Sequence, residues 1–287
     1  MKKIVNYVIF LFLLSSCETV VQIELDSGSK NLVIESLLEF SDSTETGFAR
    51  VLLTETTSFY GDIVPKKISN ATISINSVNN TYNLIEDQDS LGFYFSANPI
   101  PYLGEESFTI DVIADINGSE GHWLGTNSHT NVPLIDSIYY EYLPASPPFQ
   151  DEGYFVKIIL TDPEMEENFY HLTVLVNDSS DFELSPGTKR SKILKDEYFN
   201  GMDLNFIVND NPLKEDDHLE IILSSITEDV YEYYFNMYTL LAESSGIGVA
   251  PPFPLYGNLV SLNDNFDNAL GNFQVRSTTY KEIYIGN

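Results

Sequence analysis

The chain has 287 residues, and its 43 acidic against 14 basic residues give it a formal net charge of -29. Such a charge repels phosphate backbones, which proteins bind through Lys and Arg, and so excludes nucleic-acid binding. Hydrophobic residues make up 43% of the chain, which is ample for packed cores. The 18 Tyr and 18 Phe favour strands over helices, and a single cysteine cannot form a disulfide within the chain.

The first residues have the pattern of a secretion signal. Two lysines precede an apolar run over 4–14, which is too short to span a membrane as a helix. The sequence LSSC follows at 14–17 and resembles the lipobox of bacterial lipoproteins, in which a peptidase cuts before the cysteine and the thiol carries a lipid. We therefore expect a signal peptide over 1–16, lipid attachment at Cys17 and a lipidated tether over 17–31. The alternative is an ordinary secretion signal that is removed together with the cysteine.

The first half of the mature chain consists of short apolar runs separated by Gly, Asn, Asp and Pro. Several of them alternate apolar with polar residues, as in ATISINS (71–77) and SFTIDVIAD (107–115). A period of two in short, regularly spaced runs predicts the strands of a β-sandwich. We expect an N-terminal, Ig-like sandwich over 32–133.

The pattern changes near residue 133, where NVPLIDSI is followed by a proline-rich loop. Longer apolar runs after it predict a C-terminal β-rich domain over 134–287. Within that domain, aromatic and apolar residues recur at helical spacing from Val230 onward, and SITE at 225–228 fits a capping box. The predicted fold is mainly β, with two sandwich-like domains and one amphipathic helix near 226–244.

Several segments in a fixed order carry a resemblance to one known family. They are LVIESLL, ATISI, YLGEESFTIDV, ILTDPEMEENFYHL, DDHLEIILSSITEDVYEYY and PPFPLYGNL. The ordered set resembles the Bacteroidota outer-membrane lipoprotein family called domain of unknown function 4249. The resemblance implies a lipid-anchored outer-membrane protein with two β-rich domains, in frequent company with TonB-dependent receptors. It implies no catalytic residue, because the family has no established activity.

The membrane face is left open by the residues that follow the cysteine. Surface-exposed lipoproteins of this phylum often carry an acidic cluster there, whereas here Glu18 is followed by Thr, Val and Val. The sequence is therefore compatible with both a periplasmic and a cell-surface position.

The sequence contains few residues that indicate a metal site or a ligand-binding site. The Asn- and Asp-rich segment 261–272 supplies oxygen atoms of the kind that calcium prefers, with Asp264 and Asp267 as candidate ligands. Its spacing does not match an EF-hand, and Asn and Asp also favour turns for their own backbone hydrogen bonds. Trp123 and Tyr140 are candidates for stacking on a sugar or peptide ligand. Apart from the lipid on Cys17 and this calcium candidate, the sequence indicates no cofactor or metal.

Two functions of different classes fit these observations. The first is a non-enzymatic accessory or binding lipoprotein that associates with a TonB-dependent outer-membrane receptor. The second is a lipid-anchored glycan or peptide hydrolase that uses scattered carboxylates, since a glycosidase needs only two suitably spaced acids. The sequence contains no nucleophile elbow, P-loop or dinucleotide fingerprint, and we favour the first function.

Overall fold

The computed structural model describes residues 30–41, 44–57, 64–104, 107–148, 150–164, 167–177, 192–209, 211–243 and 253–286. The expected signal peptide, Cys17 and most of the expected tether lie outside these residues. The strands of the first half are β1 (Leu32–Ser41), β2 (Thr46–Glu55), β3 (Thr72–Asn76), β4 (Thr81–Glu86), β5 (Phe93–Ser96), β6 (Ile100–Pro101), β7 (Ser107–Ile116) and β8 (Ser119–Ser128). The second half holds β9 (Ile135–Leu143), β10 (Gly153–Thr161), β11 (Phe169–Val176), β12 (Lys192–Lys195), the 3-10 turn η1 (Asp196–Tyr198), β13 (Asp203–Ile207), β14 (His218–Ile226), helix α2 (Glu228–Glu243), β15 (Leu259–Ser261) and β16 (Leu270–Tyr284).

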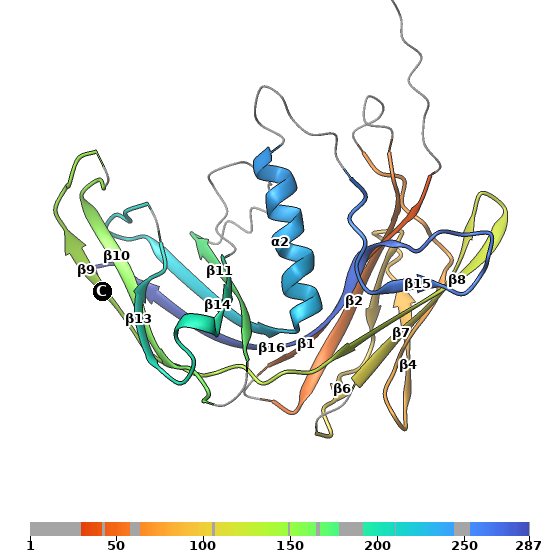
Figure 1. Ribbon diagram of the computed structural model, residues 1–287, viewed down its shortest axis with the longest axis horizontal. Coiled ribbons are helices and arrows are strands. Elements are labelled where there is room, and N and C mark those ends of the chain that lie inside the picture. The colour runs from red at the N-terminus through yellow and green to blue at the C-terminus, as the bar shows by residue number, and fades with distance from the viewer. Residues whose placement is uncertain are drawn as a thin grey trace, which may run out of the picture.

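The described strands form one large curled sheet and one small sheet (Figure 1). The large sheet runs in the order β12-β11-β14-β16-β1-β2-β5-β4-β3-β7-β8-β15, with β6 pairing with β2 beside this path, and the small sheet runs β13-β10-β9. The fold is therefore mainly β with one α-helix among the described residues, as the sequence predicts.

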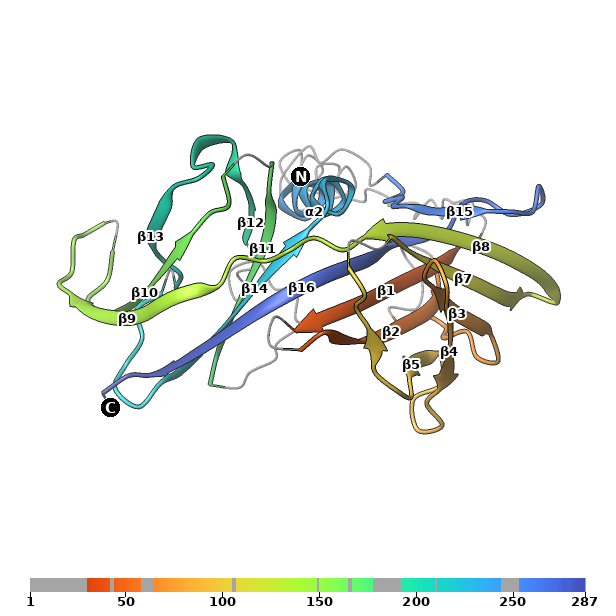
Figure 2. The ribbon, with the colours of Figure 1, turned by 90° about the horizontal axis from the view of Figure 1, so that it is seen from below.

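Strand β16 joins the two halves of the molecule. Its first residues pair in parallel with β1, from Val33 opposite Leu270 to Ser41 opposite Thr278, and its later residues pair antiparallel with β14. Figure 2 shows β16 running diagonally from the strands of the first half to those of the second. A segment late in the sequence thus supplies the centre of the large sheet.

Two hydrophobic cores lie along the large sheet. The first is built from the alternating inward residues of β1, β2, β3, β7 and β8, and the second lies between the small sheet and strands β11, β14 and β16. Phe273 and Val275 of β16 are buried in the first core, whereas Ile283 of the same strand packs against the second. The predicted division of the chain at residue 133 stays a prediction. Residues after position 133 contribute to both cores.

Helix α2 packs on the sheet face opposite the first two cores. Val230 near its start is buried in a third cluster with Phe169 and Ile226, and Figure 1 shows the helix standing over β14 and β16. The helix begins at Glu228, close to its predicted start, but Ser225 still belongs to strand β14 and is not its cap. No helix in the described part of the chain is both long and apolar enough to cross a membrane.

The start of α2 is tied to the junction between β8 and β16. The side-chain oxygen of Asn127 accepts a hydrogen bond from the backbone N–H of Val275 at 2.9 Å, and its amide donates to Thr227 Oγ1 at 2.7 Å. The same amide lies 3.2 Å from a carboxylate oxygen of Asp229 in the first helical turn. A carboxylate at this position is also favoured by the helix dipole. One buried asparagine therefore fixes the helix start against the first core.

Candidate functional site

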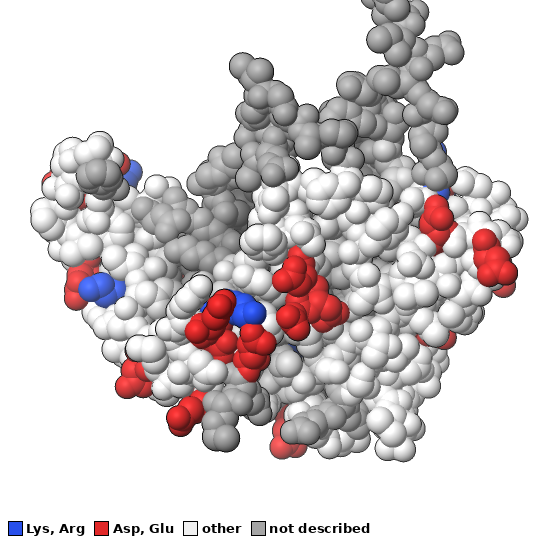
Figure 3. Space-filling view, viewed as in Figure 1, with Lys and Arg blue, Asp and Glu red and all other residues white. Residues whose placement is uncertain are grey.

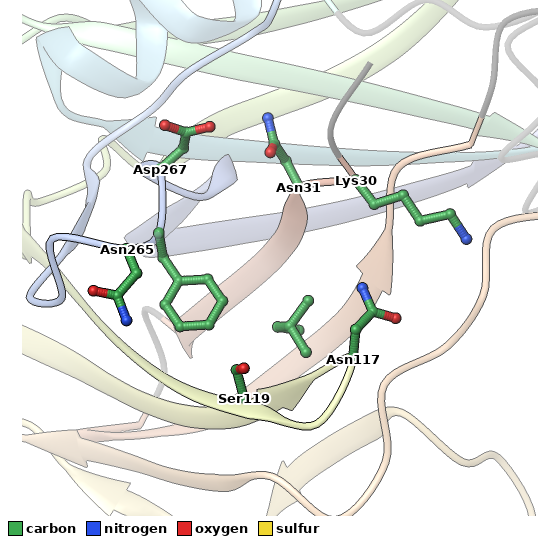
Figure 4. Close-up of a pocket in the computed structure, with 8 residues that line it drawn as sticks. Lys30, Asn31, Asn117, Ser119, Asn265 and Asp267 are labelled. Atoms are coloured by element: carbon green, nitrogen blue, oxygen red, sulfur yellow. The ribbon is translucent and has the colours of Figure 1, made fainter. Parts of the chain in front are cut away.

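A pocket lies at the end of the molecule where strand β1 begins. Three segments that are distant in sequence form it: the residues just before β1, the turn between β7 and β8, and the loop before β16. Its volume is about 290 Å³, and its walls are Lys30, Asn31, Ile116, Asn117, Ser119, Asn265, Phe266 and Asp267. Figure 4 shows the labelled side chains around it, with Asp267 and Asn31 on the side opposite Ser119. We call it the β1-end pocket.

The apolar part of the β1-end pocket is backed by the first core. Ile116 is only 6% exposed, and the ring of Phe266 meets the buried ring of Trp123 edge to face, with centroids 5.3 Å apart. The indole N–H of Trp123 donates to the backbone carbonyl of Asp267 at 3.1 Å. The tryptophan therefore holds the loop that carries Phe266 in place.

The loop before β16 is fixed by its own asparagines. Asn263 Oδ1 accepts from the backbone N–H of His122 at 2.7 Å, and Asn268 Oδ1 accepts from the backbone N–H of Ser261 at 3.0 Å. Asn265 and Asp267 lie between these two asparagines. Their side chains make no hydrogen bond to another described residue, and they line the pocket instead. The loop thus divides its polar side chains into those that shape it and those that face the pocket.

The turn between β7 and β8 is an Asn-Gly hairpin turn. Asn117 and Gly118 both have positive φ, 56° and 85°, as a tight two-residue hairpin requires. Asp115 Oδ1 accepts from the backbone N–H of Gly118 at 2.7 Å. This geometry places Asn117 and Ser119 at the pocket wall.

The charges at the β1-end pocket are balanced. Lys30 supplies one cation and Asp267 one carboxylate. The Nζ atom of Lys30 also lies 3.6 Å from Oε2 of Glu55, whose side chain is 1% exposed and whose other oxygen lies 3.3 Å from Nζ of Lys66. Elsewhere acids prevail among the charged residues, as Figure 3 shows for one face of the molecule, where more red than blue is visible. The pocket thus differs in charge from the protein as a whole.

A comparison with protein-family models matches residues 18–282 to the family described as Domain of unknown function (DUF4249). The chain belongs to this family. The match covers the first core, α2, all the residues of the β1-end pocket and the second core up to residue 282, and it confirms the family resemblance that the sequence segments indicate. A search among curated proteins found no match to this DUF4249 chain.

The structure places the residues singled out from the sequence in different surroundings. Cys17 lies outside the described residues. Trp123 is 1% exposed, so its ring is not available for stacking on a ligand, which corrects that expectation. Tyr140 meets the ring of Tyr154 at 5.5 Å, and its hydroxyl accepts from the backbone N–H of Gly286 at 3.2 Å. It contributes to the second core and not to the pocket.

The two calcium candidates are separated by the fold of their loop. Both acids are exposed, but Asp267 lines the β1-end pocket, whereas Asp264 does not. Over the described ranges, no three or more His, Cys, Asp or Glu side chains gather in a way that could hold a metal ion. The asparagines around the two acids serve the backbone of the loop, which is the alternative role that the sequence leaves open.

Sequence reasoning missed the pocket and also a buried polar cluster beneath α2. The ring of His171 stacks on Tyr234 with centroids 4.6 Å apart, and Nε2 lies 3.5 Å from the hydroxyl of Tyr238. Its Nδ1 atom has no hydrogen-bond partner among the described residues. Burial, together with the nearby charge of Arg276, lowers the pKa of His171 to about 3. The available signal was the lone histidine in the strand FYHLTVLV.

Proposed function

We propose that this DUF4249 member is a lipid-anchored outer-membrane lipoprotein that binds a ligand without transforming it and accompanies a TonB-dependent receptor. The observation that carries the anchor is the lipobox-like LSSC at 14–17, behind a positive start and a short apolar run. The receptor partnership rests on the family resemblance. The ligand-binding role rests on the β1-end pocket.

The position of the pocket agrees with this proposal. Residues 18–29 separate the expected anchor at Cys17 from Lys30 at the pocket wall. An extended chain of that length reaches about 45 Å at most. A lipid on Cys17 would therefore hold the pocket close to the membrane surface, where a receptor in the same membrane can be reached.

The chemistry of the pocket supports binding more than hydrolysis. A two-carboxylate glycosidase needs a pair of acids about 5–9.5 Å apart on either side of the bond that is cleaved. Asp267 is the one acidic residue in the wall of the β1-end pocket. Its polar neighbours are amides, a hydroxyl and an ammonium group, which orient a ligand but do not supply a second acid or base.

A closely placed pair of carboxylates does occur elsewhere, on strands β14 and β16. Glu220 and Glu282 face each other across the two strands, and the hydroxyl of Tyr280 lies 3.1 Å from one carboxylate and 2.9 Å from the other. Burial and the two carboxylates raise the pKa of Tyr280. The pair lies on a sheet face where Tyr280 is 48% exposed, so it lacks the enclosure that hydrolysis of a bound glycan needs. We therefore retain the binding function.

The anchor is tested by replacing the cysteine. Cys17→Ser should abolish incorporation of labelled fatty acid and leave the protein soluble or as an uncleaved precursor. Ser16→Ala, which keeps a small residue before the cysteine, is the matched control and should be lipidated like the wild type. A Cys17→Ser protein of mature length that still fractionates with the outer membrane would contradict the anchor.

A further inference from the structure

We propose that the β1-end pocket binds one ring of a saccharide. The inference deepens the proposed binding function and depends on it, because it assigns a ligand class to the same pocket. It rests on four features of the pocket: an apolar floor, a rim of side-chain amides that bond to no other described residue, balanced charge and a small volume.

The floor offers a surface for the apolar face of a sugar ring. Phe266 and Ile116 supply an aromatic and an aliphatic wall within an otherwise polar pocket. Sugars present a face of C–H groups that packs on aromatic rings, while their hydroxyls remain at the edges for hydrogen bonding. Because Phe266 rests on the buried Trp123, this floor is a fixed part of the first core.

The rim offers both donors and acceptors around that floor. Asn31, Asn117 and Asn265 each carry an amide with a carbonyl oxygen and an NH₂ group, and each can satisfy both the O–H and the lone pairs of a hydroxyl. Among the hydrogen bonds of the described residues, none uses the side chain of these three asparagines. Ser119 and Asp267 add a hydroxyl and a carboxylate to the same rim.

The balanced charge argues for a neutral ligand. Lys30 and Asp267 contribute one charge of each sign, and the ammonium of Lys30 is already shared with the buried Glu55. An anionic ligand would meet Asp267 within a strongly acidic protein, and a cation would find a single carboxylate. An uncharged ring with several hydroxyl groups matches the amides and the hydroxyl that make up the rest of the polar rim.

The size and rigidity of the pocket limit the ligand to one ring. Its volume of about 290 Å³ lies just below the usual range of ligand pockets, about 300 to 1,000 Å³. The backbone N–H of Thr56 donates to the carbonyl of Asn31 at 2.9 Å, and the backbone N–H of Asn31 donates to Thr56 Oγ1 at 3.0 Å, so the chain before β1 is held in place. Asn263 and Asn268 hold the opposite loop. Preorganised walls reduce the ordering cost of binding.

The experiment uses the full lipidated protein, purified in a detergent without a sugar headgroup. Glucose, N-acetylglucosamine and their β-1,4-linked disaccharides are titrated by calorimetry and by the fluorescence of Trp123, which touches Phe266. Glycine and calcium chloride are titrated as a zwitterion and a cation. We expect saturable binding of at least one sugar. Binding of the free monosaccharide indicates a soluble sugar, and binding of the disaccharide alone indicates the terminal unit of a glycan chain.

Variants then locate the site. Asp267→Asn and Asn31→Ala should each weaken sugar binding about tenfold, since the first exchanges a charged acceptor oxygen for an NH₂ donor and the second removes an amide. Asp264→Asn, an exposed acid of the same loop outside the pocket, should bind like the wild type. The inference is overturned if no sugar binds, if glycine or calcium binds in place of sugars, or if the pocket variants bind as tightly as Asp264→Asn. Recovery of a receptor with the wild type in such a case would leave the accessory function standing without this ligand class.

Discussion

The side-chain amide of Asn258 hydrogen-bonds to both backbone groups of Phe273, as a neighbouring strand would. Its Oδ1 atom accepts from the N–H of Phe273 at 2.8 Å, and its NH₂ group donates to the carbonyl of Phe273, also at 2.8 Å. Phe273 lies on the edge of β16 that faces away from β1 and precedes the residues paired with β14. A side chain therefore satisfies buried backbone groups that no strand pairs there, and closes the first core against β15.

Replacing this side chain should destabilise the protein strongly for a single polar substitution. Asn258→Ala leaves the N–H and C=O of the buried Phe273 without these partners, and unsatisfied buried groups cost about 1–3 kcal/mol each. We expect the free energy of unfolding, measured in urea, to fall by at least about 1–3 kcal/mol. Asn265→Ala, at an asparagine with no described intramolecular side-chain bond, should change it by less than about 0.5 kcal/mol. Equal effects of the two variants would contradict the role of Asn258.

The close approach of β16 to β1 predicts that one glycine cannot be replaced. Gly271 has φ of 89°, and a Cβ atom there would lie 2.2 Å from the backbone oxygen of Ile34. Gly271→Ala should prevent β1 and β16 from pairing and reduce the yield of folded protein sharply. Gly118→Ala is the matched control, because φ is 85° but the space around it is open, so it should cost only about 1–2 kcal/mol of backbone strain. Thermal unfolding of both variants checks this, and a Gly271→Ala protein as stable as the control would disprove the contact.

The buried histidine beneath α2 predicts loss of stability on mild acidification. The pKa of His171 is about 3 in the folded protein, against about 6.5 when unfolded, so the unfolded chain binds the proton first as the pH falls below 6.5. Its contribution is fully present above pH 6.5 and is lost as the pH falls toward 3, amounting to about 2 kcal/mol between pH 7 and pH 5. The groups facing it include Tyr234, Tyr238 and the charged Arg276.

Non-titrating replacements isolate this effect from the acids of the protein. His171→Phe keeps a ring against Tyr234, and His171→Gln keeps polarity, but neither binds a proton. Both should unfold with a free energy that changes less between pH 7 and pH 5 than that of the wild type. An unchanged pH dependence in both variants would show that His171 does not titrate in this range.

The single tryptophan provides a direct check of the first core. Trp123 is 1% exposed and is the one tryptophan of the chain, so all indole emission reports on its site. We expect blue-shifted emission that acrylamide quenches weakly until the protein unfolds. Emission typical of a solvated indole in the native protein would contradict both the buried ring and the floor of the β1-end pocket.

The sequence predicted local features well and distant associations poorly. Alternation with a period of two locates strands such as β3 and β7, and helical spacing locates α2, because those patterns arise from each element alone. The sequence did not predict the β1-end pocket, because residues near 30, 117 and 266 come together only in the folded, curled sheet. Trp123 was a candidate for stacking on a ligand because of its residue type, whereas the inward position that it takes on β8 depends on register.

The turn-rich loop before β16 shows the same limit on a smaller scale. Its Asn and Asp residues suggest both calcium binding and turn formation, and composition cannot separate the two roles. The structure separates them residue by residue, with Asn263 and Asn268 bound to backbone N–H groups and Asp267 at the pocket. The position of the loop depends in turn on Trp123, which lies beneath it and bonds to the backbone carbonyl of Asp267.

Affinity purification of the tagged lipoprotein from outer membranes in mild detergent, followed by mass spectrometry, tests the proposed function most directly. An accessory lipoprotein should recover a TonB-dependent receptor in stoichiometric amount, and the Cys17→Ser variant should recover much less because it no longer shares the membrane. Recovery of the lipoprotein alone across several detergent strengths would contradict the accessory role.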